Sequence, residues 1–465
     1  MTTELRPDRA PAPSNELPVA DLIGRGLIAR CFGIGTPTLS VVADPPHVSG
    51  LTPREIKARW RAFRAFWAGH LCSTIGDHMR LVALPIAADR LTGSAVVVAL
   101  IVSAEALATV LFGTMAGSVT DRRHPRPVMI RTNVARAAIL ALVALLGWSE
   151  LGPAALLVIA AFALSLLRLF HDGAESSLIA RLVPDELDVR TDDRLNLSEN
   201  IGVTVGPLLA GAAISLGVWL AFGVDAIIFV IAAIAVAVVG RLARRRHIEL
   251  APAPDEETRE PLRREFAATF KEIRANRVYR RSLVVMAFAS VAALPLGPQF
   301  VSLATDDLGL SPWAIGAMFA IGGLSGIVAA PFIERRDDIR PGVIMAGTAL
   351  FSGAVLLTGL VPSILTAALA FAAVGVGVTA AMTHLAAMRQ RVYPNHQQGR
   401  IALTSRMVVW SVLPVAAIVG GVLSDVLGPT SMWIVCGGIG LAAAAWAVVV
   451  GLAREPVTAP PLAVS

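Results

Sequence analysis

Apolar stretches recur along the chain, and short turns that contain Gly, Pro or charged residues separate them. A transmembrane α-helix needs about 20 mostly apolar residues to cross the hydrocarbon core of a bilayer. Six such stretches fall at 64–90, 94–118, 126–147, 153–180, 194–217 and 218–240, and six more at 282–304, 312–333, 341–361, 363–388, 401–424 and 430–452. The pattern predicts an all-α membrane protein with twelve transmembrane helices in two six-helix halves.

A charged segment separates the two sets of apolar stretches. It extends over 242–281, contains runs of Arg and of acidic residues, and includes a helical pattern around Phe266 and Phe270. We interpret it as a cytoplasmic linker between an N-terminal half at 61–241 and a C-terminal half at 282–454.

The two ends of the chain lack the apolar pattern. Residues 1–60 contain several prolines and no sustained period, which predicts a partly disordered cytoplasmic tail, and 455–465 form a second tail. We expect no cleavable signal, because the first residues mix acid, Arg and Pro. Basic and aromatic residues at 53–61 suit either a short helix at the membrane surface or a flank that orients the first span.

Arginines gather on alternate loops. The clusters lie at 59–64, 122–126, 181–194, in the linker, at 335–340 and at 389–400, and the other loops carry little beyond Arg90. By the positive-inside rule, both termini and the linker lie in the cytoplasm, and the protein spans the inner membrane. We attribute the formal net charge of +6 to this topology and expect no nucleic-acid partner.

Composition agrees with the membrane prediction. The chain is 55% hydrophobic and only 16% charged, with a mean hydropathy of +0.67, so a soluble enzyme is excluded. No phosphate-binding loop of the GxxxxGK[ST] type is present, which leaves an ion gradient as the energy source. Cys31, Cys72 and Cys436 have no paired spacing, so we expect neither a disulfide framework nor a zinc site. We also expect no cofactor.

The loop after the second apolar stretch reads G-S-V-T-D-R-R-H-P-R at 117–126. It resembles the loop signature of the major facilitator superfamily, with departures at His124 and Pro125. The resemblance implies a gating motif made of Gly117, Asp121, Arg122 and Arg126.

The fifth apolar stretch carries a second motif, G-V-T-V-G-P-L-L-A-G at 202–211. It resembles the antiporter signature of the same superfamily, in which Gly202, Gly206, Pro207 and Gly211 are the defining positions and Ala210 replaces a glycine. Small residues allow close helix packing, and an internal proline kinks the helix. The resemblance implies an exporter.

Further segments are similar to the drug:proton antiporter branch that includes macrolide-efflux proteins and enterobactin exporters. They lie at 73–77, 182–187, 225–226, 399–400 and 420–425. The resemblance covers about residues 60–455 and implies a substrate:proton antiporter that works by alternating access.

Charged side chains inside the apolar stretches are the candidates for proton coupling, because such residues are costly in a membrane and are commonly functional. Asp77 lies deep in the first stretch with Arg80 one turn further, and Glu105 lies near the middle of the second without a partner in its own helix. We predict that Glu105 carries the proton and that its distance to Arg80 or Arg168 changes during transport.

Other polar or aromatic residues in the stretches receive structural interpretations. Arg168 and Asp172 form an i,i+4 pair, and we expect structural pairing for Asp225, His384 and Arg406. Apolar pockets are predicted, with lining candidates Phe66, Trp67, Phe288, Phe300, Met318 and Phe319, although such positions commonly pack inside the bundle.

The sequence therefore favours an exporter of bulky hydrophobic or amphipathic small molecules, such as an antibiotic, a siderophore or a secondary metabolite. Its expected partners are the small-molecule substrate, the proton and the lipid bilayer, and the expected state is a monomer. Two alternatives stay open: a proton-coupled nutrient importer, and a membrane sensor or assembly partner that uses the tail and linker for docking.

Overall fold

The computed structural model describes residues 53–121, 124–149, 154–182, 188–245, 262–297, 299–334, 340–394, 397–452 and 455. The chain divides into two units, Met1–Gly50 and Leu51–Ser465, and the described residues belong to the second. The predicted tail up to 52, the linker residues 246–261 and the end of the chain lie outside the described residues. All regular secondary structure in the described ranges is helical.

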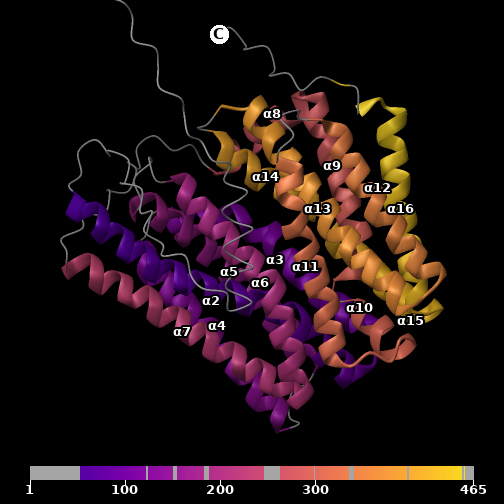
Figure 1. Ribbon diagram of the computed structural model, residues 1–465, viewed down its shortest axis with the longest axis horizontal. Coiled ribbons are helices and arrows are strands. Elements are labelled where there is room, and N and C mark those ends of the chain that lie inside the picture. The colour runs from indigo at the N-terminus through magenta and orange to yellow at the C-terminus, as the bar shows by residue number, and fades with distance from the viewer. Residues whose placement is uncertain are drawn as a thin grey trace, which may run out of the picture. The chain divides into compact units, whose positions relative to one another are not determined.

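The N-terminal half contains six long helices (Figure 1). They are α2 (Pro53–Thr92), α3 (Ala95–Asp121), α4 (Pro125–Trp148), α5 (Ala154–Leu182), α6 (Asp188–Leu216) and α7 (Val218–Arg245). The basic segment at 53–61 continues directly into α2, so this part of the chain extends the first span and does not form a separate surface helix.

The C-terminal half follows the helix of the linker, α8 (Leu262–Ala275). Its elements are α9 (Arg277–Ala293), η3 (Leu294–Leu296), α10 (Phe300–Ser302), η4 (Leu303–Asp307), α11 (Pro312–Glu334), α12 (Pro341–Leu360), α13 (Ile364–Val392), α14 (Gln398–Trp410), α15 (Leu413–Leu427) and α16 (Pro429–Val449).

Eleven helical stretches within the described ranges are long and apolar enough to cross a membrane. The other long helix, α2, includes Asp77, Arg80 and Asp89 in the region predicted to span, and these charges lower its apolarity. It nevertheless packs along both α6 and α7, as a first transmembrane helix would. With α2 included, the structure matches the predicted number of twelve spans.

Two spans of the C-terminal half are interrupted where the sequence favours a break. The stretch Arg277–Asp307 changes from α9 to η3 at Pro295 and continues through Gly297 into the short helix α10 and the π-turn η4. The stretch Arg400–Leu427 changes from α14 to α15 just before Pro414. Proline removes a backbone donor and clashes with the preceding turn, which explains both breaks.

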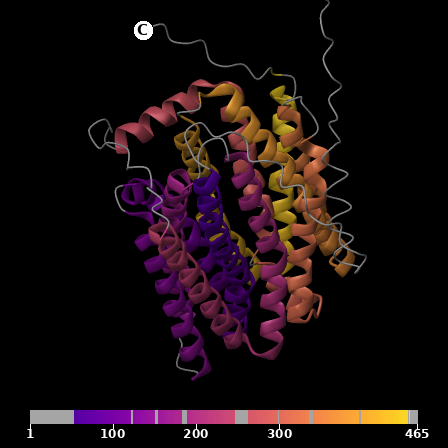
Figure 2. The same cartoon turned by 60° about the vertical axis from the view of Figure 1, so that its left-hand side comes forward.

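The two halves repeat one packing pattern. In the first half, α4 packs on α5 and α7, and α3 packs on α5; in the second, α12 packs on α13 and α16, and α11 packs on α13. The halves meet where α6 packs on α11 and where α3 packs on α15. Figures 1 and 2 show the indigo-to-magenta half beside the orange-to-yellow half, and Figure 1 shows α6 and α11 where the two halves adjoin.

The first turn of α3 forms a polar contact between the halves. The carboxylate of Asp425, near the end of α15, accepts hydrogen bonds from Ser94 Oγ at 2.8 Å, Ala95 N at 2.7 Å and Val96 N at 3.3 Å. These groups include two backbone donors that an α-helix leaves unsatisfied at its start. Asp425 therefore caps α3 from the opposite half.

Candidate functional site

Four helices bring charged side chains together inside the N-terminal half, beginning with Asp77 on α2. Its Oδ1 lies 3.4 Å from Arg80 Nη1, and its Oδ2 lies 3.5 Å from Arg136 Nη1 and 3.7 Å from Arg168 Nε. Asp77, Arg80 and Arg136 are all buried. One carboxylate thus lies within ion-pair distance of three guanidinium groups, from α2, α4 and α5.

Glu105 joins this cluster from α3. Its Oε1 lies 3.4 Å from Arg80 Nε, so Arg80 stands between Asp77 and Glu105. The Glu105 side chain is 18% exposed, against 7% for that of Asp77, which makes it the more accessible carboxyl. Arg168 also contacts Asp172, at 3.7 Å. The four residues predicted for proton coupling, Asp77, Arg80, Glu105 and Arg168, therefore form one site.

Arg136 is the member of the site that the sequence analysis missed. It stands in the middle of α4, and its side chain is completely buried. The sequence did contain a signal for this residue, because an arginine in the middle of a predicted transmembrane span is commonly functional. Its guanidinium carbon lies 4.9 Å from the centre of the Phe229 ring on α7, in the geometry of a cation–π contact.

The ion pairs of the site are longer than good hydrogen bonds. Their N–O distances of 3.4–3.7 Å exceed the usual range for N–H···O bonds. Several buried atoms have no hydrogen-bond partner, including Asp77 Oδ1, Arg80 Nε and all three side-chain nitrogens of Arg136. The groups are therefore held near one another by charge and not by short hydrogen bonds.

A second titratable cluster is built around Glu175 of α5. Its carboxylate lies 2.8 Å from His70 Nδ1 and 3.5 Å from His171 Nε2, and the other ring nitrogen of His171 lies 3.2 Å from Thr132 Oγ1. The His171–Glu175 pair follows the i,i+4 spacing of the sequence, whereas His70 comes from α2. Within the described ranges, no group of three or more His, Cys, Asp and Glu residues could hold a metal ion.

The residues of the predicted gating motif are described only in part. Gly117 and Asp121 belong to the last turns of α3, and Arg122 lies outside the described residues. Arg126, in the first turn of α4, places its guanidinium against Gly240 of α7, where a Cβ would overlap it. Gly240 thus provides the space that the Arg126 side chain occupies.

The antiporter-like motif faces two neighbours. A Cβ at Gly202 would lie 2.5 Å from Thr74 Cγ2, and one at Gly206 would lie 2.8 Å from Ile75 O, so both glycines allow α2 to approach. A Cβ at Gly211 would lie 2.6 Å from the carbonyl oxygen of Pro312 on α11. The motif therefore lets α6 pack closely against its own half and against the other half.

The polar residues for which we expected structural pairing differ from one another. His384 Nδ1 lies 3.0 Å from Ala380 O within its own helix, and the Arg406 guanidinium stacks on the Trp410 ring at 4.7 Å. By contrast, neither carboxyl oxygen of Asp225 has a hydrogen-bond partner among the described residues. Two of the predicted pocket-lining aromatics, Phe66 and Phe300, are fully buried in helix packing.

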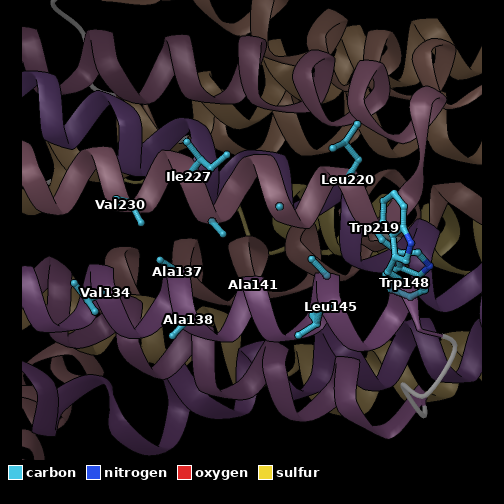
Figure 3. Close-up of a pocket in the computed structure, with 13 residues that line it drawn as sticks. Val134, Ala137, Ala138, Ala141, Leu145, Trp148, Trp219, Leu220, Ile227 and Val230 are labelled. Carbon is cyan, nitrogen blue, oxygen red and sulfur yellow. The ribbon is translucent and has the colours of Figure 1, made fainter.

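A groove of about 710 Å³ runs between α4 and α7 (Figure 3). Its lining is apolar, with Trp148 and Trp219 at one end and exposed side chains such as Leu145 and Ile227 along its sides. Arg136 and Asp225 directly precede two lining residues, Ala137 and Ala226, but both charged side chains are buried. The groove contains no titratable group and is separate from the charged site.

A family model places the helices and motifs in context: residues 66–413 match the Major Facilitator Superfamily. The chain belongs to this superfamily. It is 23% identical over 390 residues to the uncharacterized MFS-type transporter YfiS of Bacillus subtilis (strain 168), an alignment that covers 80% of this chain and 88% of YfiS. The facilitator is therefore a multi-pass membrane transporter and not an enzyme.

Solved structures show the same fold. A bacterial homologue of the iron transporter ferroportin, in an inward-facing state, has a TM-score of 0.65 at 16% identity and aligns over 85% of this chain and 99% of its own. The POT family transporter PepTSo has a TM-score of 0.67 at 13% identity, over 85% and 98%. The prediction of an all-α facilitator fold with two six-helix halves is confirmed.

Proposed function

We propose that this facilitator exports bulky hydrophobic or amphipathic small molecules in exchange for protons. The observation that carries the proposal is the buried site in which Arg80 lies between the carboxylates of Asp77 and Glu105. Intramembrane ionisable groups that pair loosely are typical of proton pathways in transporters. The antiporter-like motif in α6 and its close contacts with α2 and α11 support exchange over uptake.

The position of Glu105 supports a mechanism. Glu105 belongs to α3, which packs on α5 of its own half and on α15 of the other half, whereas Arg80 belongs to α2, which packs mainly on α6 and α7. A shift of α3 relative to α2 during the transport cycle would change the distance between Glu105 and Arg80. Protonation of Glu105 would release Arg80 to Asp77, and the return of Arg80 would favour loss of the proton.

The remaining residues receive roles by resemblance. We assign Gly117, Asp121, Arg122 and Arg126 to a gate on the cytoplasmic side, and Gly202, Gly206, Pro207 and Gly211 to the helix that rocks against the opposite half. We further propose a monomer in the inner membrane with both termini in the cytoplasm. The substrate class follows from the branch that the motifs resemble.

The test is accumulation of a panel of fluorescent hydrophobic drugs in an efflux-deficient host. The arms are wild type, Glu105→Gln and an empty host, each with and without a protonophore, and Asp306→Asn serves as a control because it removes an exposed carboxylate outside the site. We expect wild type and Asp306→Asn to lower accumulation, and both Glu105→Gln and the protonophore to abolish the effect. Raised accumulation would indicate proton-coupled uptake, and no difference from the empty host across the panel would count against drug export.

A further inference from the structure

Asp225 of α7 is a buried acid that the site described above does not use. It lies inside the span Val218–Leu242 and is 1% exposed. Neither of its carboxyl oxygens has a hydrogen-bond partner among the described residues. Oδ1 packs directly on α2, since a Cβ added at Gly76 would lie 2.5 Å from it. No structural contact explains why an acid occupies this position.

The charged groups around Asp225 belong to the coupling site. Asp77 and Arg80 on α2 and Arg136 on α4 interact with it electrostatically. Phe229, one turn further along α7, packs on Gly76 together with Asp225. The guanidinium carbon of Arg136 lies 4.9 Å from the centre of the Phe229 ring. Arg136 therefore lies next to both Asp77 and the surface that Asp225 shares with Phe229.

An ionised carboxylate without a partner is costly in a membrane interior, so the neutral acid is the form that this arrangement favours. Arg136 contacts Asp77 through Nη1 at 3.5 Å, and none of its side-chain nitrogens is hydrogen-bonded. A modest rotation of the Arg136 side chain over the Phe229 ring would bring the guanidinium to Asp225. Asp77 would keep Arg80 and Arg168 as partners.

We infer that Asp225 is a second proton-carrying carboxyl group of the transporter and that it alternates with Asp77 as the partner of Arg136. When Arg136 turns to Asp225, the O–H bond of the Asp225 acid breaks, the proton passes to water on the releasing side, and the guanidinium supplies the counter-charge. When Arg136 returns to Asp77, Asp225 takes up a proton again. The inference rests on the proposed proton exchange and adds a second carrier to it.

Infrared spectroscopy of the purified full-length protein in lipid nanodiscs tests the protonation directly and needs no substrate. Wild type should show the C=O band of a protonated carboxyl at neutral pH, and Asp225→Asn should lose it. Asp306→Asn, which removes an exposed acid outside the site, should keep it. Arg136→Gln should retain the band at alkaline pH values where wild type loses it. An Asp225→Asn spectrum equal to that of wild type would overturn the inference.

A thermal melt verifies that each variant folds. If Asp225→Asn does not fold, Asp225→Glu replaces it in the infrared experiment. The C=O band of Asp225→Glu should then lie at a different frequency from that of wild type, and an unshifted band would contradict the assignment. Export of any dye that wild type transports adds a second readout, in which Asp225→Asn should lose transport and Asp225→Glu should retain part of it. Full transport by Asp225→Asn would also overturn the inference. Absence of export by wild type, with the band present, would instead count against the proposed function.

Discussion

The interiors of the two halves differ in chemistry although their helices pack in the same pattern. Buried or half-buried acids and arginines of α2, α3, α4, α5 and α7 meet inside the N-terminal half. The described interior of the C-terminal half contains hydroxyl groups, Gln299 and His384 but no buried Asp or Glu. Its acids, such as Asp306 and Asp425, lie near helix ends.

Aromatic packing takes the place of charge in the second half. The ring of Phe300 lies 4.8 Å from that of Phe371, 6.1 Å from that of Trp433 and 6.3 Å from that of Phe319. These contacts join the broken seventh span to α11, α13 and α16. Among the described residues, the buried charged cluster therefore lies in the first half and the aromatic cluster in the second, and our proposal assigns the ion chemistry to the first half.

The largest effect is expected when the charge balance of the N-terminal half is broken. Asp77→Ala leaves Arg80, Arg136 and Arg168 without their shared carboxylate, and removing one partner of a buried pair costs about 3–5 kcal/mol. Thermal unfolding in detergent should show a strongly lowered midpoint and export should be lost. The double variant Asp77→Ala/Arg136→Ala should recover part of the stability; a double variant less stable than the single would contradict the charge-balance account.

A substitution in the aromatic cluster should affect stability without affecting ion coupling. Phe300→Ala removes a fully buried ring together with its three ring contacts, so we expect a loss of about 3–5 kcal/mol of stability, seen as a lowered midpoint in a thermal melt. The remaining folded protein should still lose export when a protonophore is added. If Phe300→Ala still exported the drug in the presence of the protonophore, the claim that this substitution leaves ion coupling intact would be contradicted.

Close packing around the charged site provides a third, smaller test. In Gly76→Ala the new Cβ would lie 2.5 Å from Asp225 Oδ1 and 2.9 Å from the Phe229 ring, and such overpacking costs about 1–3 kcal/mol. Gly223→Ala on α7 is the matched control, because nothing lies within 4 Å of its added Cβ. Equal melting temperatures for the two variants would argue against the described packing of α2 on α7.

The smallest effect is expected at the contact between the halves. Asp425→Ala removes the cap of α3, and loss of an N-cap typically costs about 0.5–2 kcal/mol. Amide hydrogen exchange should accelerate in the first turn of α3, whereas Asp306→Ala should leave that turn unchanged. Unaltered exchange in Asp425→Ala would show that the first turn of α3 does not depend on this cap.

Most of the fold could be predicted from the sequence, because each span must be long and apolar by itself. The pair Asp77–Arg80 was also predictable from the sequence, because both residues lie one turn apart in the same helix. The partners of Glu105 and the role of Arg136 depend on contacts between helices, about which spacing along one chain carries no information. The interruption of the seventh span had signals in Pro295 and Gly297, yet the apolar run alone predicted one continuous helix.

The most direct measurement of the central claim is proton movement in proteoliposomes that contain a pH-sensitive dye. A drug that wild type exports is added in the presence and absence of a proton gradient, and wild type, Glu105→Gln and Phe300→Ala are compared at equal amounts of folded protein. We predict drug-dependent proton flux for wild type and Phe300→Ala and none for Glu105→Gln. Equal flux for wild type and Glu105→Gln would contradict the assignment of proton coupling to Glu105 in the N-terminal half.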